Sequence, residues 1–262
     1  MADPRAADVA EADRLLAAAA DEGVARLPVL STGELWVLCG DQQVLADEAE
    51  ARWWTSMSEP ERAKYAAMII DFLLDRGLLR RPDATDPGPA AGGPELPMAP
   101  ELAMIVAARQ RPAVVVVGSL ADGSAGEAPR MYGLADAGQP PRVLIGDVNS
   151  PASQPAFGPL HHFSLMSPVL AGRVLALWAT APGAPGKGGF LSRKKDRTKI
   201  VDLYHNRPGE QLTRDRLTVL PGESGQFQVS RQSPGTEPTM PVTHDLDQLA
   251  DLLTAMLTGA AG

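Results

Sequence analysis

The side chains of this sequence that could do chemistry are few, and they lie far apart along the chain. Of its four histidines, His161 and His162 are adjacent. Adjacent residues on a strand point to opposite faces of a sheet, so these two rings could not bind the same metal ion. The sequence therefore favours two polar residues near the end of a strand, and we expect no metal site.

Motifs for phosphate binding and nucleophilic catalysis are incomplete. Around the Gly-Lys pair at 186–187, Ala181 stands where a phosphate-binding loop needs its first glycine, and Gly188 stands where it needs Ser or Thr. Ser124 and Ser224 each lack one glycine of a G-x-S-x-G elbow. We therefore expect no catalytic residue and no cofactor.

The single cysteine, Cys39, lies in an apolar stretch beside Trp36 and Leu38. A free cysteine among apolar neighbours is typical of a small buried residue. One cysteine also excludes an internal disulfide and a cysteine cluster for zinc.

The most concentrated charge is a basic segment at residues 187–199, KGGFLSRKKDRTK, with six basic residues and one acidic residue. It interrupts an otherwise acidic chain and encloses two apolar side chains. It is either a solvated connector or a loop that docks an acidic partner. In the second case the contact residues are Phe190, Leu191, Arg193, Lys194 and Lys195.

Length and composition are those of an ordinary globular protein, with 262 residues, 44% hydrophobic and 21% charged. The N-terminus lacks the basic start and apolar middle of a signal peptide, and no later apolar run is long enough to cross a bilayer. Net charge is −8, and residues 1–80 hold 15 Asp/Glu against 8 Lys/Arg. We therefore expect a cytoplasmic protein that inserts into no membrane and binds no nucleic acid.

The fold is expected to centre on a strand that follows a short helix. Pro100 and Glu101 start the helix, which ends where Pro112 cannot continue it. The next five residues, 113–117, include four consecutive valines. An all-β-branched run with no polar alternation predicts an interior strand, covered on both faces.

Four further helices are predicted from their ends and periodicity. An Ala-rich helix at 3–20 is expected to be peripheral, and Asp245 caps a last helix at 245–257. Ser58 and Glu61 form a capping box for a helix at 58–76, whose predicted buried residues are Tyr65, Met68, Ile69, Phe72 and Leu73. Ser167 caps a helix at 167–179, whose predicted buried residues are Leu170, Val174, Leu177 and Trp178. Further strands are expected at 130–134, 142–148, 199–204 and 226–231.

Two stretches leave alternatives open. Leu27–Cys39 is apolar without a clean period and is either a buried strand or, as we favour, a short helix opened by Ser31 or Thr32. The paired Trp53 and Trp54 belong either to a loop packed over the core or to one buried anchor and one exposed contact residue; we favour the loop.

Proline- and glycine-rich loops are expected at 81–97 and 181–189. They divide one domain, 1–262, into a first half of about 1–180 and a second half of about 190–262.

Three stretches together resemble the first half of the EspG family, the cytosolic chaperones of type VII secretion: ELWVLCG, the capped helix ending in DRGLL, and MAPELAMIVAARQRPAVVVV. The resemblance covers residues 34–117 and, more loosely, 160–257. It implies an α+β fold with a central antiparallel sheet, flanking helical bundles and two pseudo-repeated halves. It also implies binding of a secreted helical heterodimer to keep it soluble, without catalysis or cofactor.

Two other classes are alternatives. DFLLDRGLLRRP is similar to the last helix and wing of a winged-helix DNA-binding domain, but the helix at 58–76 has more acidic than basic residues. An enzyme would have to work without a recognisable motif. We therefore expect a non-catalytic cytosolic protein-binding chaperone or adaptor.

Overall fold

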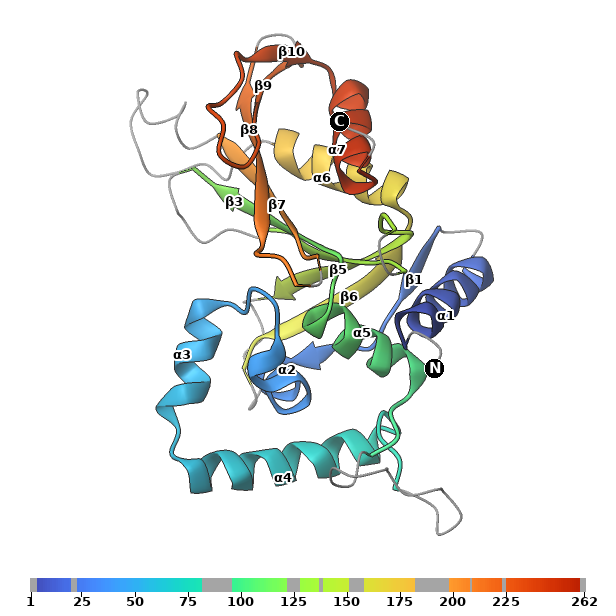
Figure 1. Cartoon of the computed structure of the whole chain (residues 1–262). Coiled ribbons are helices and arrows are strands. Elements are labelled where there is room, and N and C mark those ends of the chain that lie inside the picture. The colour runs from blue at the N-terminus through green and yellow to red at the C-terminus, as the bar shows by residue number, and fades with distance from the viewer. Residues whose placement is uncertain are drawn as a thin grey trace.

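The computed structural model describes residues 4–19, 23–81, 96–121, 128–136, 139–150, 158–181, 198–207, 209–222 and 225–259. In this part of the chain the fold is α+β with a central antiparallel sheet, which confirms the predicted fold class (Figure 1). The sheet order is β1-β6-β5-β4-β3-β7-β8-β9-β10, and β2 also pairs with β6. The strands are β1 (Val24–Arg26), β2 (Leu30–Ser31), β3 (Val114–Leu120), β4 (Arg130–Leu134), β5 (Val143–Ser150), β6 (Leu160–Met166), β7 (Lys199–His205), β8 (Thr213–Pro221), β9 (Phe227–Gln232) and β10 (Val242–His244).

The valine strand β3 lies in the interior of the sheet, between β4 and β7, as predicted. Successive side chains of a strand point to opposite faces. Val115 accordingly packs into the core on one face, whereas Val114 and Val116 pack into the core on the other. All three are 0–1% exposed, which explains why no position in the run is polar.

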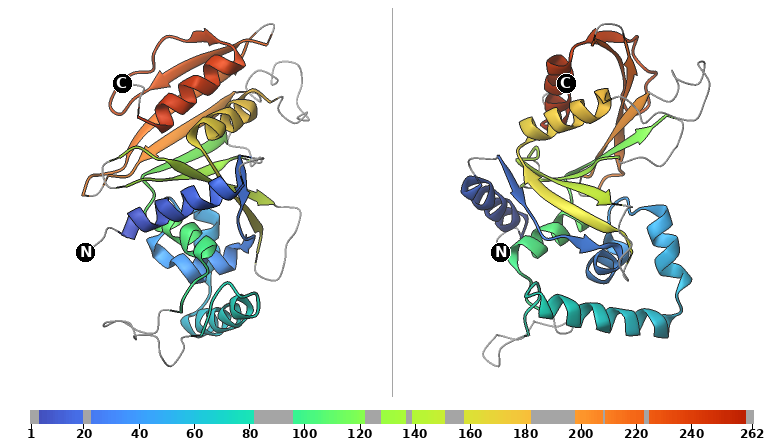
Figure 2. Two further views of the ribbon diagram at one scale, coloured as in Figure 1. Left: turned by 90° about the vertical axis from the view of Figure 1, so that its right-hand side faces the viewer. Right: turned by 180° about the vertical axis from the view of Figure 1, so that it is seen from behind.

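The helices divide between the two faces of the sheet, and Figure 2 shows α6 and α7 side by side. Residues of α1, α2, α4 and α5 belong to the same core as Val115, whereas residues of α6 and α7 belong to the core that contains Val114 and Val116. The helices are α1 (Pro4–Ala18), α2 (Thr32–Cys39), α3 (Glu48–Ser56), α4 (Glu59–Asp75), α5 (Pro100–Gln110), α6 (Pro168–Thr180) and α7 (Leu246–Leu257), with a 3-10 turn η1 (Gly40–Gln42).

The order of elements repeats. Strands β3 to β6 pair consecutively and are followed by α6, and strands β7 to β10 pair consecutively and are followed by α7. The two groups meet at the antiparallel β3–β7 pair.

Helix starts follow the side chains that the sequence singles out. Ser58 with Glu61 and Asp245 with Gln248 form capping boxes for α4 and α7. The open alternative at Leu27–Cys39 resolves mainly as helix, because Ser31 forms a capping box with Glu34 at the start of α2.

Half of the predicted buried face of α6 is wrong: Leu170 and Trp178 pack against the core as expected, but Val174 and Leu177 do not. Val174 and Leu177 are 36% and 50% exposed, and the helix instead buries small residues with one leucine: Ala171, Gly172, Leu175, Ala176 and Ala179. A Cβ on Gly172 would lie 2.9 Å from the carbonyl oxygen of Ala250 on α7. The small face lets the two helix backbones approach closely, and a larger apolar face would keep them apart.

Two other expectations also change. The N-terminal helix is not peripheral, because Val9 and Ala12 are 2% and 0% exposed within the core. Trp53 and Trp54 lie on helix α3 rather than in a loop, and Glu50 N donates to Asp47 Oδ1 at its start. Asp47 thus acts as a cap, and the acidic residues after it suit a first helical turn.

Most of the predicted loops at 81–97 and 181–189 lie outside the described residues. Within the described ranges, each helix is too short or too polar to cross a bilayer.

Candidate functional site

A network of buried charged side chains lies between the sheet and the N-terminal helices. Arg109 on α5 is 1% exposed, and its guanidinium donates to Asp147 Oδ2 on β5 at 2.8 Å and to Gln43 Oε1 at 2.9 Å. Its side chain also lies over the ring of Tyr132 on β4, 5.5 Å from the ring centroid. A buried guanidinium needs such partners, since an unpaired charge would destabilise the fold strongly.

His161 on β6 completes the network. Its Nδ1 lies 2.9 Å from Asp147 Oδ1, and its Nε2 lies 3.1 Å from Thr32 Oγ1 and 3.4 Å from Glu50 Oε1. Six elements therefore meet at one buried cluster: α2, α3, α5, β4, β5 and β6. His162 points the other way and is exposed, as the strand alternation predicts.

Thr32, His161 and Asp147 are arranged like a hydrolase triad, with a hydroxyl on one ring nitrogen and a carboxylate on the other. Burial by itself lowers the pKa of His161, but the contacts with Asp147 and Glu50 outweigh it and raise the pKa to about 9. A general base has to be unprotonated at the working pH. The protonated His161 therefore serves as the common partner of two carboxylates. Thr32, whose hydroxyl contacts the ring, is only 2% exposed.

The same network acts on Asp147. Burial alone would raise the pKa of its carboxyl group, but the contacts with His161 and the nearby charge of Arg109 lower it. We conclude that the cluster fastens α3 and α5 to the sheet.

No group of three or more His, Cys, Asp or Glu side chains in the described residues is placed to hold a metal ion.

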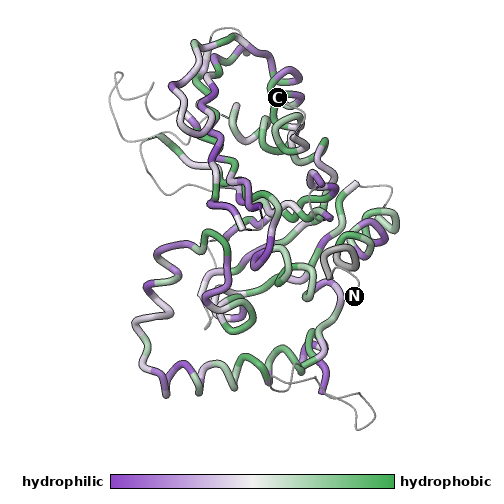
Figure 3. The backbone as a smooth tube through the Cα atoms, in the orientation of Figure 1, coloured by the Kyte–Doolittle hydropathy of each residue, from purple (hydrophilic) through white to green (hydrophobic). Residues whose placement is uncertain are grey.

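A second feature is an apolar surface on the outside of α3 and α4. It consists of Trp53, Met68 and Phe72, which are 36%, 49% and 43% exposed, with the half-buried Tyr65 between them. We call these four residues the α3–α4 surface. Two of them, Met68 and Phe72, were expected in the core; only Ile69 and Leu73 of α4 are fully buried. The second half of α4 is hydrophobic (Figure 3), and α4 lies at the end of the molecule opposite α7 (Figure 1).

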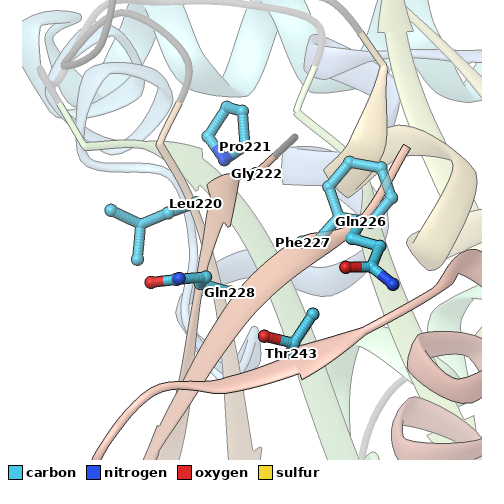
Figure 4. A pocket seen from close by; sticks show the side chains of 7 residues that line it. All are labelled: Leu220, Pro221, Gly222, Gln226, Phe227, Gln228 and Thr243. Carbon is cyan, nitrogen blue, oxygen red and sulfur yellow. The ribbon is translucent and has the colours of Figure 1, made fainter. Parts of the chain in front are cut away.

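A third feature is a pocket of about 480 Å³ beside β8, β9 and β10 (Figure 4). Among the described residues, the side chains that line the pocket are apolar or neutral polar ones. Its lining residues are Leu220, Pro221, Gly222, Gln226, Phe227, Gln228 and Thr243.

Most of the residues singled out from the sequence lie outside the part of the chain that the structure describes. The candidate contact residues Phe190, Leu191, Arg193, Lys194 and Lys195 lie outside the described residues, as do Ser124, Ser224 and the Gly-Lys pair at 186–187. Lys199, the last cation of the basic segment, belongs to β7 instead, is 4% exposed, and donates to the carbonyls of Trp178 and Ala181 at the end of α6.

Cys39 is 3% exposed, as predicted, and burial raises the pKa of its thiol to about 11. The buried network was missed because its members are far apart in sequence. One signal was present, since Asp147 falls in the predicted strand 142–148, where a buried carboxylate requires a partner.

Comparison of the chain with models of protein families, with curated proteins and with solved structures found no significant match.

Proposed function

We propose that the protein is a non-catalytic, cytoplasmic chaperone or adaptor that binds a helical protein partner. The observation that carries this proposal is the α3–α4 surface. Met68 and Phe72 are one helical turn apart, and Trp53 contacts Tyr65 with ring centroids 5.8 Å apart. Exposed apolar side chains that gather in one place, with aromatic anchors, are typical of protein interaction sites.

The partner class comes from the EspG resemblance, which implies a secreted helical heterodimer. A helix laid on an apolar surface would bury side chains spaced three and four residues apart. The basic segment with Phe190, Leu191, Arg193, Lys194 and Lys195 is proposed as a further contact, and the protein is not proposed to bind nucleic acid.

The experiment is coexpression with each small helical protein found to be encoded beside the gene, followed by size-exclusion chromatography. The variant carries Met68→Ser and Phe72→Ser. The matched control carries Val174→Ser and Leu177→Ser, two residues of α6 with similar exposure. Loss of interface anchors mainly speeds dissociation, so the α4 variant is expected to lose the complex and the α6 variant to keep it.

Thermal unfolding of both variants serves as the folding control, because all four substitutions are at exposed positions. Equal complex formation by both variants, or no complex with any neighbouring helical protein, would contradict the proposal.

A further inference from the structure

The α3–α4 surface is held in a fixed shape by aromatic contacts beneath it. Trp54 on α3 stacks on Trp36 of α2 with ring centroids 6.1 Å apart and planes at 16°. Tyr65 of α4 lies edge-on to both Trp53 and Trp54. On the side of the sheet, Glu50 fastens α3 to His161. A surface formed by such packed rings loses little conformational freedom on binding, which favours affinity.

The exposed border of this surface is acidic. On a helix, residues three and four apart are neighbours. Asp71 is therefore next to Met68, and Asp75 is next to both Phe72 and Asp71. Both carboxylates are exposed. Glu61, nearer the start of α4, instead accepts hydrogen bonds from Ser58 in the capping box.

Basic side chains only partly balance the negative charge of this border. Arg62 and Lys64 are the two basic residues of α4, against four carboxylates. Arg76 follows the helix, but its guanidinium donates to Glu34 Oε1 at 2.6 Å and to the carbonyl of Val29 at 2.7 Å. The same guanidinium lies over the ring of Phe72, 5.5 Å from its centroid, and its charge is paired with Glu34. Asp71 and Asp75 outnumber Lys64 beside Met68, so the border is acidic at these two carboxylates.

We infer that the α3–α4 surface binds an amphipathic helix whose apolar residues are flanked by Lys or Arg. This inference rests on the proposed function and adds the charge of the partner. The apolar side chains of that helix would pack on Trp53, Met68 and Phe72, and its cations would face Asp71 and Asp75. Apolar anchors set the lifetime of such a complex, and border charges set its association rate and its selectivity.

A second copy of the chain fits the α3–α4 surface less well than a basic amphipathic helix. Two-fold contact through the same surface would bring the acidic border of one copy against that of the other. Like charges placed opposite each other oppose association.

The test uses two synthetic amphipathic helical peptides with identical leucines at i, i+3, i+4 and i+7. One has lysine at the flanking positions and the other has glutamate. Binding to the full chain is measured by fluorescence anisotropy at about 50 mM and about 500 mM salt. The lysine peptide is expected to bind at least about tenfold more tightly at low salt, and the difference is expected to shrink at high salt.

Two variants locate the site. Phe72→Ser should weaken the lysine peptide about tenfold or more, because it removes an anchor. Asp71→Lys with Asp75→Lys should reverse the preference between the peptides. The matched control is Asp247→Lys with Asp251→Lys, which changes two exposed carboxylates with the same spacing on α7 and should leave the preference unchanged.

The outcomes separate the inference from the proposed function. If both peptides bind equally and Phe72→Ser weakens the binding of both, the inferred positive charge of the partner is wrong, but the α3–α4 surface is still the binding site. Binding of neither peptide, or binding that Phe72→Ser does not change, would overturn the inference, while the coexpression experiment decides the proposed function independently.

Discussion

At the scale of single residues, the charge of His161 is the most consequential feature of the described fold. His161 is only 3% exposed, and its ring faces Asp147 of β5 and Glu50 of α3. Arg109 of α5 contacts the same two carboxylates. Arg130 of β4 adds a further positive charge that lowers the pKa of Asp147. The protonated imidazole is therefore stabilised by its direct contacts with the two carboxylates.

The contacts of His161 with the two carboxylates predict a stability that depends on pH. The pKa of His161 rises from the ordinary 6.5 to about 9 on folding, so its contribution is fully present below pH 6.5 and is lost as pH rises through about 9. The loss amounts to about 3 kcal/mol at most. Urea unfolding between these pH values should show the decline in the wild type and much less of it in His161→Gln.

The neighbouring residue supplies the control for this prediction. His162→Gln changes an exposed ring on the same strand and should keep the wild-type pH profile. If His161→Gln declines as steeply as the wild type, the ring is not charged in the folded protein.

At the scale of elements, close packing between α6 and α7 depends on one glycine. Gly172→Ala adds a methyl group against the carbonyl oxygen of Ala250, at 2.9 Å, and the amide nitrogen of Thr254, at 3.0 Å. Alanine favours a helix by about 1 kcal/mol over glycine, but overpacking against backbone atoms costs about 1–3 kcal/mol. The net effect should be a lower melting temperature. Arg173→Ala, at the adjacent exposed position, should leave it nearly unchanged, and a Gly172→Ala protein more stable than the wild type would show that the helices can move apart freely.

The same elements show what the sequence could predict. Helix starts depend on local hydrogen bonds, so Ser58 with Glu61 and Asp245 with Gln248 were recognisable from spacing alone. The buried face of a helix depends on the partner it meets. On α6 the periodic apolar residues Val174 and Leu177 face solvent, because close contact with α7 requires the small residues instead.

The candidate site was harder to predict for a related reason. Met68 and Phe72 continue the period of the buried residues of α4, so periodicity assigned them to the core. In the fold, α4 meets its neighbours along a narrower stripe through Ile69 and Leu73. Likewise, the pairing of Arg109 with Asp147 requires α5 to lie against β5, which no local pattern specifies.

At the scale of the whole molecule, one sheet separates two cores, and the valines of β3 contribute to both. Coverage on both faces was predictable from four consecutive valines. The helices that cover each face could not be assigned from sequence, because each choice depends on contacts between elements far apart along the chain. The EspG resemblance implied two repeated halves, and the strand order defines each repeat as four consecutively paired strands followed by a helix.

The charge of the whole molecule leads to the last prediction, that the protein does not bind DNA. Net charge is −8, and α4, the helix that resembles a winged-helix recognition element, carries four carboxylates against Arg62 and Lys64. Nucleic-acid affinity comes largely from the release of counterions by clustered cations, which α4 lacks. Neither genomic nor single-stranded DNA should shift on a gel at physiological salt. Binding tighter than about micromolar with a steep salt dependence would revive the regulator alternative. The triple variant Arg193→Glu, Lys194→Glu and Lys195→Glu would then show whether the basic segment, rather than α4, holds the DNA.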